Sequence, residues 1–481
     1  MKTRITILIA VVAMVCLMAP APSAAQNAQN VRLDAVAKAL GASGVKSLEI
    51  TGDGFTYAIG QSAVPGVPWP KFNMKDYVRT VNYEAAASSE VLLRSRAEAR
   101  GGGLPAVGEV KQQLFVAGDQ AWNVVGDNAV AAPIALAERQ FQLWATPHGI
   151  VKGAALYDGT IKGRTISFAV PGRFRLTATV DGKNLIQKVD GVIPNPVLGD
   201  LRMEIEYSDY KDFGGVKFPM KITQTGGGMP ALDMTVTGVK VNPAAEIVAP
   251  DPVRQATSPY TRVTTQSVAD GVWYVTGGTH HSVVIAMADH AIVVEAPLND
   301  ERALTVLAAA RTLVGAKPIK YVVVSHHHFD HSGGVRAFGA EGVTVVTHET
   351  ARPFFERALA ARATVAPDHM AKANRKATVE GFRDKHVLSD ATRTVEIHSI
   401  AGNQHADDIL MVYLPKEKLL IQSDVFTPVA PNAQYPSTIN PNTVHFAETI
   451  QKLGFSVEQH LPLHGRVVPF EELNKAIGRG N

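Results

Sequence analysis

The chain has 481 residues, of which 46% are hydrophobic and 19% are charged, and its formal net charge is only +3. This length and apolar content allow two or three globular domains with filled cores. The near balance of 47 basic and 44 acidic residues argues against the dense positive surface that nucleic-acid binding requires.

The first 25 residues have the layout of a secretory signal peptide, with two basic residues, an apolar run over residues 5–18 and small residues through Ala25. We expect cleavage after Ala25; a retained membrane anchor is the alternative, although the run is short for a full span. The only cysteine, Cys16, lies in this run, so the mature chain is expected to contain no thiol. No second apolar stretch is long enough to cross a bilayer, which predicts a periplasmic or secreted protein without a stable membrane span.

Residues 26–240 are predicted to form a β-rich N-terminal accessory domain. Short apolar and β-branched runs such as QQLFVAGDQAWNVVG alternate with Gly, Asp and Pro turns, a spacing that favours an antiparallel sheet. The segment PIALAERQFQL, residues 133–143, has a proline in its first turn and apolar residues at helical spacing, which predicts a helix. The Gly triplets at 101–103 and 226–228 are interpreted as turns.

The pattern changes in the second half of the chain. Residues 241–260 contain four prolines and are expected to form an extended linker. Residues 261–481 then alternate apolar strands with helices, as in HAIVVEAP, DERALTVLAAARTLVG and IKYVVV. This alternation indicates layered α/β packing.

The segment SHHHFDHSGG, which begins at residue 325, directly follows the apolar strand pattern IKYVVV. His326 and His328 are two residues apart, so in an extended segment both side chains lie on the same side. Asp330 and His331 follow where the chain turns, and they can face a second point nearby. One metal ion cannot accept all of these ligands with good geometry, whereas two adjacent ions can. A solvent-exposed histidine cluster without metal is the alternative, and His327 is expected to pack against or orient its neighbours.

Three further polar residues stand at the edges of apolar elements downstream. His405 precedes a strand in AGNQHADDILMVYLP, Asp424 ends the strand LLIQSDVF, and His464 follows LP in LPLHGR. Each of them alone fits a capping aspartate or a surface histidine. Their order along the chain, HxHxDH followed by His, Asp and His, favours a shared site.

This order resembles that of the metallo-β-lactamase fold superfamily of hydrolases, over roughly residues 261–481. The resemblance implies an α/β protein whose C-terminal domain is a four-layer αββα sandwich. It also implies a first zinc ion held by His326, His328 and His405, a second held by Asp330, His331 and His464, and Asp424 as the bridging carboxylate. Iron or manganese is open as the native metal, because the same ligand types accept them. Glu295 stands where many members have aspartate, and its expected role is to support the HxHxDH loop.

Two such ions can hold a hydroxide between them, with the pKa of bound water near 7, and this hydroxide is the expected nucleophile. Asp330 is the expected catalytic residue, placed to orient the hydroxide and accept its proton. By resemblance, an aspartate at position 424 is typical of thioesterases, lactonases and phosphodiesterases. The first hypothesis is therefore an exported dinuclear-zinc hydrolase of a small-molecule carbonyl ester, thioester or lactone, and a β-lactam hydrolase is the main alternative.

A third hypothesis is an envelope binding protein with a secondary metal site. The N-terminal region, in YSDYKDFGGVKFPMKITQ, loosely resembles the half-barrel of periplasmic lipoprotein-carrier proteins. An accessory sheet that shapes the active-site mouth or mediates a homodimer is the plainer interpretation. The roles of His280 and His281, in a turn that could border the active-site mouth, and of His445, a candidate for substrate contact, are left open.

Overall fold

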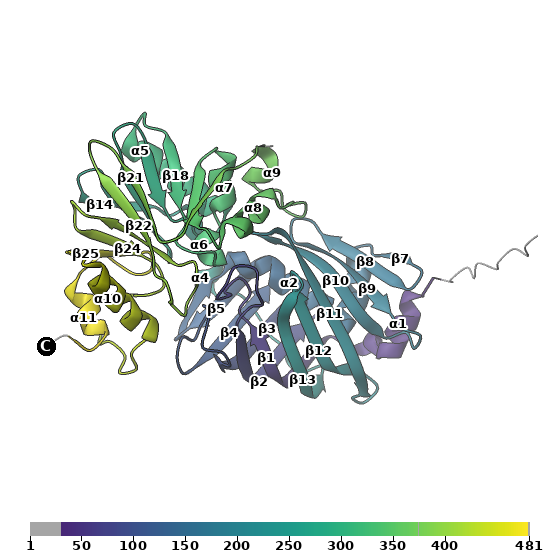
Figure 1. The fold of residues 1–481 in the computed structure, drawn as a ribbon. Coiled ribbons are helices and arrows are strands. Elements are labelled where there is room, and N and C mark those ends of the chain that lie inside the picture. The colour runs from purple at the N-terminus through teal and green to yellow at the C-terminus, as the bar shows by residue number, and fades with distance from the viewer. Residues whose placement is uncertain (1–29, 374, 480–481) are drawn as a thin grey trace, which may run out of the picture.

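A computed structural model describes residues 30–373 and 375–479, so the predicted signal peptide lies outside the described residues. The chain forms an N-terminal β-rich domain and a C-terminal domain built on two further sheets (Figure 1). Within the described ranges, no helix has both the length and the hydropathy needed to cross a membrane.

The N-terminal domain is built on one antiparallel sheet of 13 strands, in the order β6-β5-β4-β3-β2-β1-β13-β12-β11-β10-β9-β8-β7. Strands that follow each other in the sequence are neighbours, except that β6 and β7 lie at opposite edges of the sheet. In addition, β1 pairs with β13, which joins the two ends of the domain's sequence. The antiparallel prediction for this region is confirmed. The strands are β1 (Ser47–Tyr57), β2 (Lys71–Asn82), β3 (Ala87–Arg96), β4 (Glu109–Ala117), β5 (Gln120–Val125), β6 (Asn128–Ala131), β7 (Thr160–Lys162), β8 (Thr165–Val170), β9 (Phe174–Val180), β10 (Ile186–Asn195), β11 (Gly199–Asp212), β12 (Lys217–Gly226) and β13 (Met229–Val241).

Helices α1 (Leu33–Leu40), α2 (Leu136–Ala145) and α3 (Pro147–Leu156) cover one face of this sheet. The sequence predicted a helix over residues 133–143, and the structure has a short 3₁₀ turn (Pro133–Ala135) followed by α2. Helix α2 contacts β3, β4 and β5 as well as β9 and β10, which are far apart in the strand order. The sheet therefore curves around α2, and its concave face and the three helices share one apolar core (Figure 1).

The segment expected to be an extended linker is partly helical, because it contains α4 (Asp251–Arg254). Val253 of α4 and the preceding Ala249 are buried against Trp122 of β5. The connection between the domains thus packs on the N-terminal sheet.

The C-terminal domain contains a sheet in the order β14-β15-β16-β17-β18-β19-β20 and a second one in the order β21-β22-β23-β24-β25-β26. Strands β17 to β20 run parallel to one another, as do β24 and β25. The strands of the first sheet are β14 (Thr264–Ala269), β15 (Val272–Thr276), β16 (Ser282–Ala286), β17 (Ala291–Val294), β18 (Ile319–Val323), β19 (Thr344–His348) and β20 (Val379–Phe382). Those of the second are β21 (Lys385–Ser389), β22 (Thr394–Ser399), β23 (Leu410–Leu414), β24 (Leu419–Gln422), β25 (Gln459–Pro462) and β26 (Val468–Pro469).

Alternating apolar residues place these sheets face to face between two layers of helices. Val283 of β16 belongs to the core between the sheets, together with Ile421 of β24, whereas its neighbour Val284 belongs to a core shared with helices. The other face of the second sheet packs on the last helices through Phe446 and Leu473. This is the expected αββα arrangement. The helices are α5 (Asp300–Val314), α6 (Phe329–Ser332), α7 (Val335–Ala340), α8 (Arg352–Ala360), α9 (His369–Ala373), α10 (Pro441–Leu453) and α11 (Glu471–Ala476).

The carboxyl ends of β17, β18, β24 and β25 position the candidate site. The segments that follow these strands contain Glu295, the HxHxDH segment, Asp424 and His464. Because β17 and β18 are parallel, and β24 and β25 are parallel, each pair of strands delivers its following loop to the same edge.

Two loops of the N-terminal domain reach this edge, one between β1 and β2 and one between β3 and β4. The first accepts hydrogen bonds from Phe329 N to Gly60 O at 3.2 Å and from Asp407 N to Ala63 O at 2.8 Å. In the second, Gly101 N donates to the carbonyl oxygen of residue 404 at 2.8 Å. The domains are therefore joined by backbone hydrogen bonds beside the histidine-rich segment.

Candidate metal centre

The structure brings the seven predicted ligands into two adjacent clusters of potential metal-binding side chains. In each cluster, one ligand atom of every member lies within 4.8 Å of those of the others. The first cluster consists of His326, His328, His405 and Asp424, and the second of His280, Asp330, His331 and His464. The division between clusters is the one implied by the resemblance, with His280 added.

In the first cluster, three imidazole nitrogens converge. His326 Nε2 lies 2.9 Å from His328 Nδ1 and 3.2 Å from His405 Nε2. Zinc–nitrogen bonds of about 2.0–2.1 Å in a tetrahedral site would place two ligand nitrogens roughly 3.3 Å apart. The spacing of the donor atoms therefore fits a single small ion at their centre.

Hydrogen bonds that the histidines make away from the clusters determine which ring nitrogen of each is available to a metal ion. Carbonyl and carboxylate oxygens can only accept hydrogen bonds, so a ring nitrogen bonded to one of them carries a proton, and in the neutral ring the other nitrogen has a free lone pair. Outward bonds of this kind run from His328 Nε2 to Ser62 O at 2.9 Å, from His331 Nδ1 to Glu295 Oε2 at 2.9 Å and from His464 Nδ1 to Thr279 O at 3.1 Å. Partners of this kind orient metal-binding histidines.

In the second cluster, His331 Nε2 lies 3.0 Å from His464 Nε2 and 3.8 Å from Asp330 Oδ2. His280 Nε2 approaches the same carboxylate oxygen at 3.2 Å. The turn that carries His280 is held by the buried Arg302, which donates to the carbonyl oxygen of His280 at 3.4 Å. The sequence left His280 open, and the structure makes it part of this cluster.

The other two unassigned histidines lie outside both clusters. His281 is buried and bonds through Nε2 to Gly465 O at 2.9 Å, and burial lowers its pKa to about 4. It therefore supports the loop that carries His464. His445 of α10 lies with its Nδ1 3.4 Å from the side-chain amide of Asn403, in the loop before His405.

Asp424 joins the two clusters. Its Oδ2 lies 2.9 Å from His405 Nε2 and 3.0 Å from His331 Nε2, and its Oδ1 lies 2.9 Å from His464 Nε2. Burial alone would raise the pKa of Asp424, but the surrounding imidazoles hold it well below its usual range. The carboxylate is thus ionised, and its oxygens face donor atoms of both clusters.

The charge state of the site suits cations. Burial lowers the pKa of His326 to about 4 and that of His328 well below its usual value, so both are neutral, as metal binding requires. Burial alone would also lower the pKa of His331, but Asp424, Asp330 and the hydrogen bond that His331 donates to Glu295 raise it well above its usual value. A positive charge is therefore favoured where His331 faces the carboxylates of Asp330 and Asp424, and a bound metal ion would supply this charge.

Buried hydrogen bonds fix the HxHxDH segment. Glu295, with φ +81°, accepts hydrogen bonds from Ser325 N at 3.1 Å and Ser325 Oγ at 2.6 Å, in addition to the bond from His331. This is the support that the sequence assigned to Glu295. His327 points away from the clusters, because its Nδ1 bonds to Asp408 Oδ1 at 2.7 Å and its Nε2 to Ser62 Oγ at 3.0 Å.

The N-terminal domain also contributes to the site, and no pattern in the sequence had indicated this. Gln61 Nε2 donates to Asp330 Oδ1 at 2.7 Å, and Ser62 provides the carbonyl oxygen that orients His328. Gly102 lies so close that a Cβ there would stand 2.7 Å from His328 Cε1. Neither Gln61 nor Ser62 belongs to a recognisable motif. The Gly triplet at 101–103 was the available signal of close approach, and it was interpreted only as a turn.

Fold and site together define the class as a metal-dependent hydrolase. The family model of the metallo-beta-lactamase superfamily matches residues 275–427, which include every cluster member except His464. No curated protein sequence matches the chain.

Solved structures similar to the chain include a metallo-beta-lactamase from Pontibacter korlensis, at 20% identity over 45% of this chain and 98% of that one, with a TM-score of 0.35. The metallo-beta-lactamase FIM-1 from Pseudomonas aeruginosa, in its mono-zinc form, is 18% identical over 45% of this chain and 94% of that one, with a TM-score of 0.35. The rubredoxin oxygen:oxidoreductase of Desulfovibrio gigas is 17% identical over 45% of this chain and 60% of that one, with a TM-score of 0.34.

Proposed function

We propose that the chain is an exported dinuclear-zinc hydrolase that cleaves a small-molecule carbonyl ester, thioester or lactone. The observation that carries this proposal is the position of Asp424. One oxygen of its carboxylate lies 2.9 Å from His405 of the first cluster, and the other lies 2.9 Å from His464 of the second. A carboxylate in this position can bind two metal ions at once.

The donor set supports zinc. The clusters offer imidazole nitrogens and carboxylate oxygens, and the only cysteine of the chain is Cys16, within the predicted signal peptide. Nitrogen and oxygen donors of this kind bind zinc, and they also accept iron or manganese. Two bound zinc ions would lower the pKa of water to about 7 and polarise a carbonyl oxygen.

Asp330 is the residue that can move a proton. Its Oδ1 accepts a hydrogen bond from Gln61 at 2.7 Å, and its Oδ2 lies 3.2 Å from His280 Nε2, so the carboxylate is held in one orientation. Burial alone would raise the pKa of Asp330, but His331 and His280 hold it well below its usual range. An ionised and oriented carboxylate can take a proton from an attacking water and pass it to a leaving group.

The substrate class rests on the resemblance to the superfamily, in which an aspartate at the position of Asp424 is typical of enzymes that act on thioesters and lactones. Export rests on residues 1–25, and the intact mass of protein recovered outside the cytoplasm tests it. We expect the mass of a chain that begins at residue 26. The mass of a chain that retains Met1 would contradict export with cleavage of a signal peptide.

Metal analysis tests the dinuclear site. We expect about two zinc ions per chain after zinc supplementation, as in two-metal hydrolases. A His405→Ala variant should lose metal, whereas the matched control His386→Ala, on strand β21, should retain it. Far less than one zinc per chain in the unmodified protein would contradict the proposal.

A panel of substrates on the zinc-loaded protein tests the reaction. It contains thioesters, lactones, aryl esters, phosphodiesters and a chromogenic β-lactam. Turnover of a carbonyl ester, thioester or lactone that His405→Ala abolishes is the expected result. A preference for the β-lactam would replace the proposed substrate class, and no turnover at full metal loading would contradict a hydrolase.

A further inference from the structure

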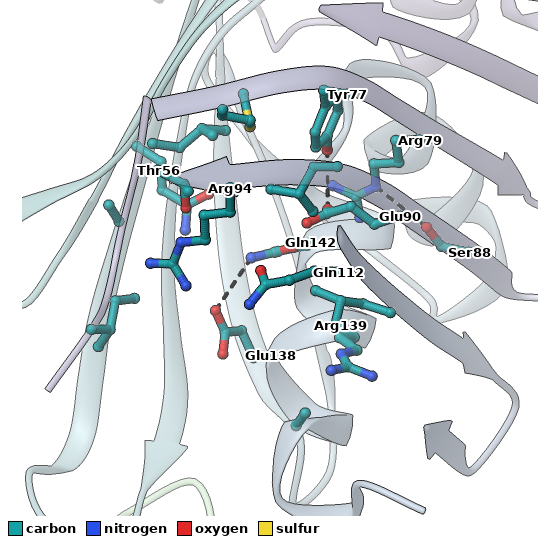
Figure 2. A pocket seen from close by; sticks show the side chains of 18 of the residues that line it. Thr56, Tyr77, Arg79, Ser88, Glu90, Arg94, Gln112, Glu138, Arg139 and Gln142 are labelled. Carbon is teal, nitrogen blue, oxygen red and sulfur yellow. Dashed lines mark hydrogen bonds between the residues drawn. The ribbon is translucent and has the colours of Figure 1, made fainter. Parts of the chain in front are cut away.

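A second buried polar site lies in the N-terminal domain, between the concave face of the sheet and α2. There the structure contains a cavity of about 220 Å³, lined by strands β1 to β4, β12 and β13 and by α2 (Figure 2). Within the described chain, no member of the two metal clusters lines it. This cavity is therefore distinct from the metal centre.

The strand alternation explains why polar side chains enter this cavity. Ser88, Glu90, Leu92 and Arg94 are two residues apart along β3, so all four side chains lie on the concave face. Elsewhere on this face the same alternation places apolar residues in the core. The charged residues of β3 thus occupy positions that apolar residues could have filled, which is costly unless each charge has a partner.

Arg94 is the charge that lacks such a partner. The residue is only 9% exposed, and among the described residues its Nε and Nη2 have no hydrogen-bond partner. The guanidinium lies over the ring of Phe72, 3.9 Å from the ring centroid. Burial lowers the pKa of Arg94 to about 10, so the group is still charged at neutral pH. Figure 2 shows Arg94 reaching into the space that Gln112, Glu138 and Gln142 also face.

The other charged side chains of the cavity have polar contacts. Arg79 is directly opposite Glu90 in the strand register, and Glu90 also accepts a hydrogen bond from Tyr77 at 3.0 Å. Arg139 donates to two backbone carbonyl oxygens at 2.8 and 3.0 Å. Among the described lining residues, three arginines face two glutamates, Glu90 and Glu138, which leaves one positive charge. Of the three arginines, Arg94 is the one whose Nε and Nη2 have no hydrogen-bond partner among the described residues.

We propose that the N-terminal cavity binds a small monocarboxylate with an apolar chain, whose carboxylate pairs with Arg94. A guanidinium presents a planar fork of donors that matches a carboxylate, and one negative charge balances the cavity. The apolar part of the ligand would contact the side chains of Ile59, Met74, Leu92, Leu114 and Leu232. The volume lies below the roughly 300–1,000 Å³ of sites for drug-sized ligands, so the ligand is small.

Calorimetric titration of the zinc-loaded protein with octanoate tests this site, with octanol as the uncharged comparison. We expect octanoate to bind, and Arg94→Met to weaken binding at least about tenfold, as loss of a hydrogen bond to a charged group does. Octanol should bind at least about tenfold more weakly than octanoate for the same reason. The matched control is Arg202→Met, because Arg202 is exposed on β11 of the same sheet. Failure of octanoate to bind, or equal binding by Arg94→Met, overturns the proposal.

Thermal unfolding separates ligand binding from a structural role of Arg94. In the absence of octanoate, Arg94→Met should raise the Tm, because it removes a buried charge that has no partner. Octanoate should raise the Tm of the unmodified protein but not that of Arg94→Met. A lower Tm for Arg94→Met with an unchanged response to octanoate would mean that the arginine stabilises the fold, and would overturn the proposal.

Carboxylates also bind zinc, so the titration is repeated on Asp424→Ala. Retained octanoate binding in this variant places the site in the N-terminal cavity, whereas loss of binding places it at the metal centre and overturns the proposal. The cavity does not depend on the proposed hydrolase. Octanoate binding without hydrolysis, or hydrolysis without octanoate binding, would contradict one proposal and leave the other standing.

Discussion

Both domains bury charged side chains, but the charge that lacks a partner has the opposite sign in each domain. In the C-terminal domain, Asp330 and Asp424 lie among imidazoles, two of which burial keeps neutral, and the site favours cations. In the N-terminal cavity, three arginines face two glutamates, and among the described residues Arg94 Nε and Nη2 have no hydrogen-bond partner, so the site favours an anion. A buried charge needs a partner in both cases. The sign of the charge that remains indicates which class of ligand each domain accepts.

The domains also differ in how they assemble their sites. The cavity side chains come mostly from neighbouring strands of one sheet, whereas the metal centre collects loops that follow strands of two sheets. The metal centre in addition receives Gln61 and Ser62 from the N-terminal domain. The N-terminal domain therefore completes the site of its neighbour while containing a cavity of its own.

The largest expected effect is that of Asp424→Ala on hydrolysis. Removal of a partner that only orients a ligand costs about 10–100-fold in metal affinity or activity, so loss of the proposed bridging ligand should cost more than about 100-fold. Zinc content and turnover should fall together. Unchanged turnover would mean that Asp424 does not bind metal. The two clusters would then be separate sites that Asp424 does not link.

Gly102→Ala should come next, at about 100-fold in turnover. A Cβ at this position would stand 2.7 Å from His328 Cε1, so the ring must move, and a shift approaching 1 Å in an active site can cost about 100-fold. The matched control is Gly44→Ala, because a Cβ there meets no atom within 4 Å. Equal zinc affinity in the two variants would show that the N-terminal domain only lies beside the metal centre.

Gln61→Ala should lower zinc affinity or turnover about tenfold. Its amide orients Asp330 through a hydrogen bond of 2.7 Å, and loss of a partner that orients a ligand costs about 10–100-fold. The exposed Gln266 on β14 provides the control Gln266→Ala. An altered absorption spectrum of the cobalt-substituted Gln61→Ala protein would place the effect at the metal, whereas a spectrum and activity like those of the control would contradict it.

Arg100→Ala should have the smallest effect. Arg100 forms an ion pair with Asp407 across the domain interface, but its side chain is 53% exposed. Exposed ion pairs contribute about 1 kcal/mol or less, so the free energy of unfolding should change by no more than that. A larger loss in urea denaturation would mean that this surface pair, and not the backbone hydrogen bonds at Gly60 and Ala63, holds the domains together.

Much of the fold and of the metal centre could be predicted from local patterns. The alternation of apolar residues and turns predicted the antiparallel sheet, and the strand–helix alternation after residue 261 predicted the layered domain. Candidate ligands such as His326 and Asp424 could be found because each lies in the segment that follows an apolar strand. His280 could not be assigned in this way, because its place in the second cluster depends on how Arg302 holds its turn.

The sequence by itself determined the histidine-rich segment, the downstream ligands and the order in which they occur, because strand periodicity and ligand chemistry are local properties. The tertiary structure alone decided that Gln61 and Ser62 complete a site more than 260 residues away, with separations of 269 and 266 positions. It also decided that Arg94 Nε and Nη2 have no hydrogen-bond partner among the described residues. Both features depend on which distant side chains are brought within hydrogen-bonding distance by tertiary packing. The neighbouring residues in the sequence do not predict this.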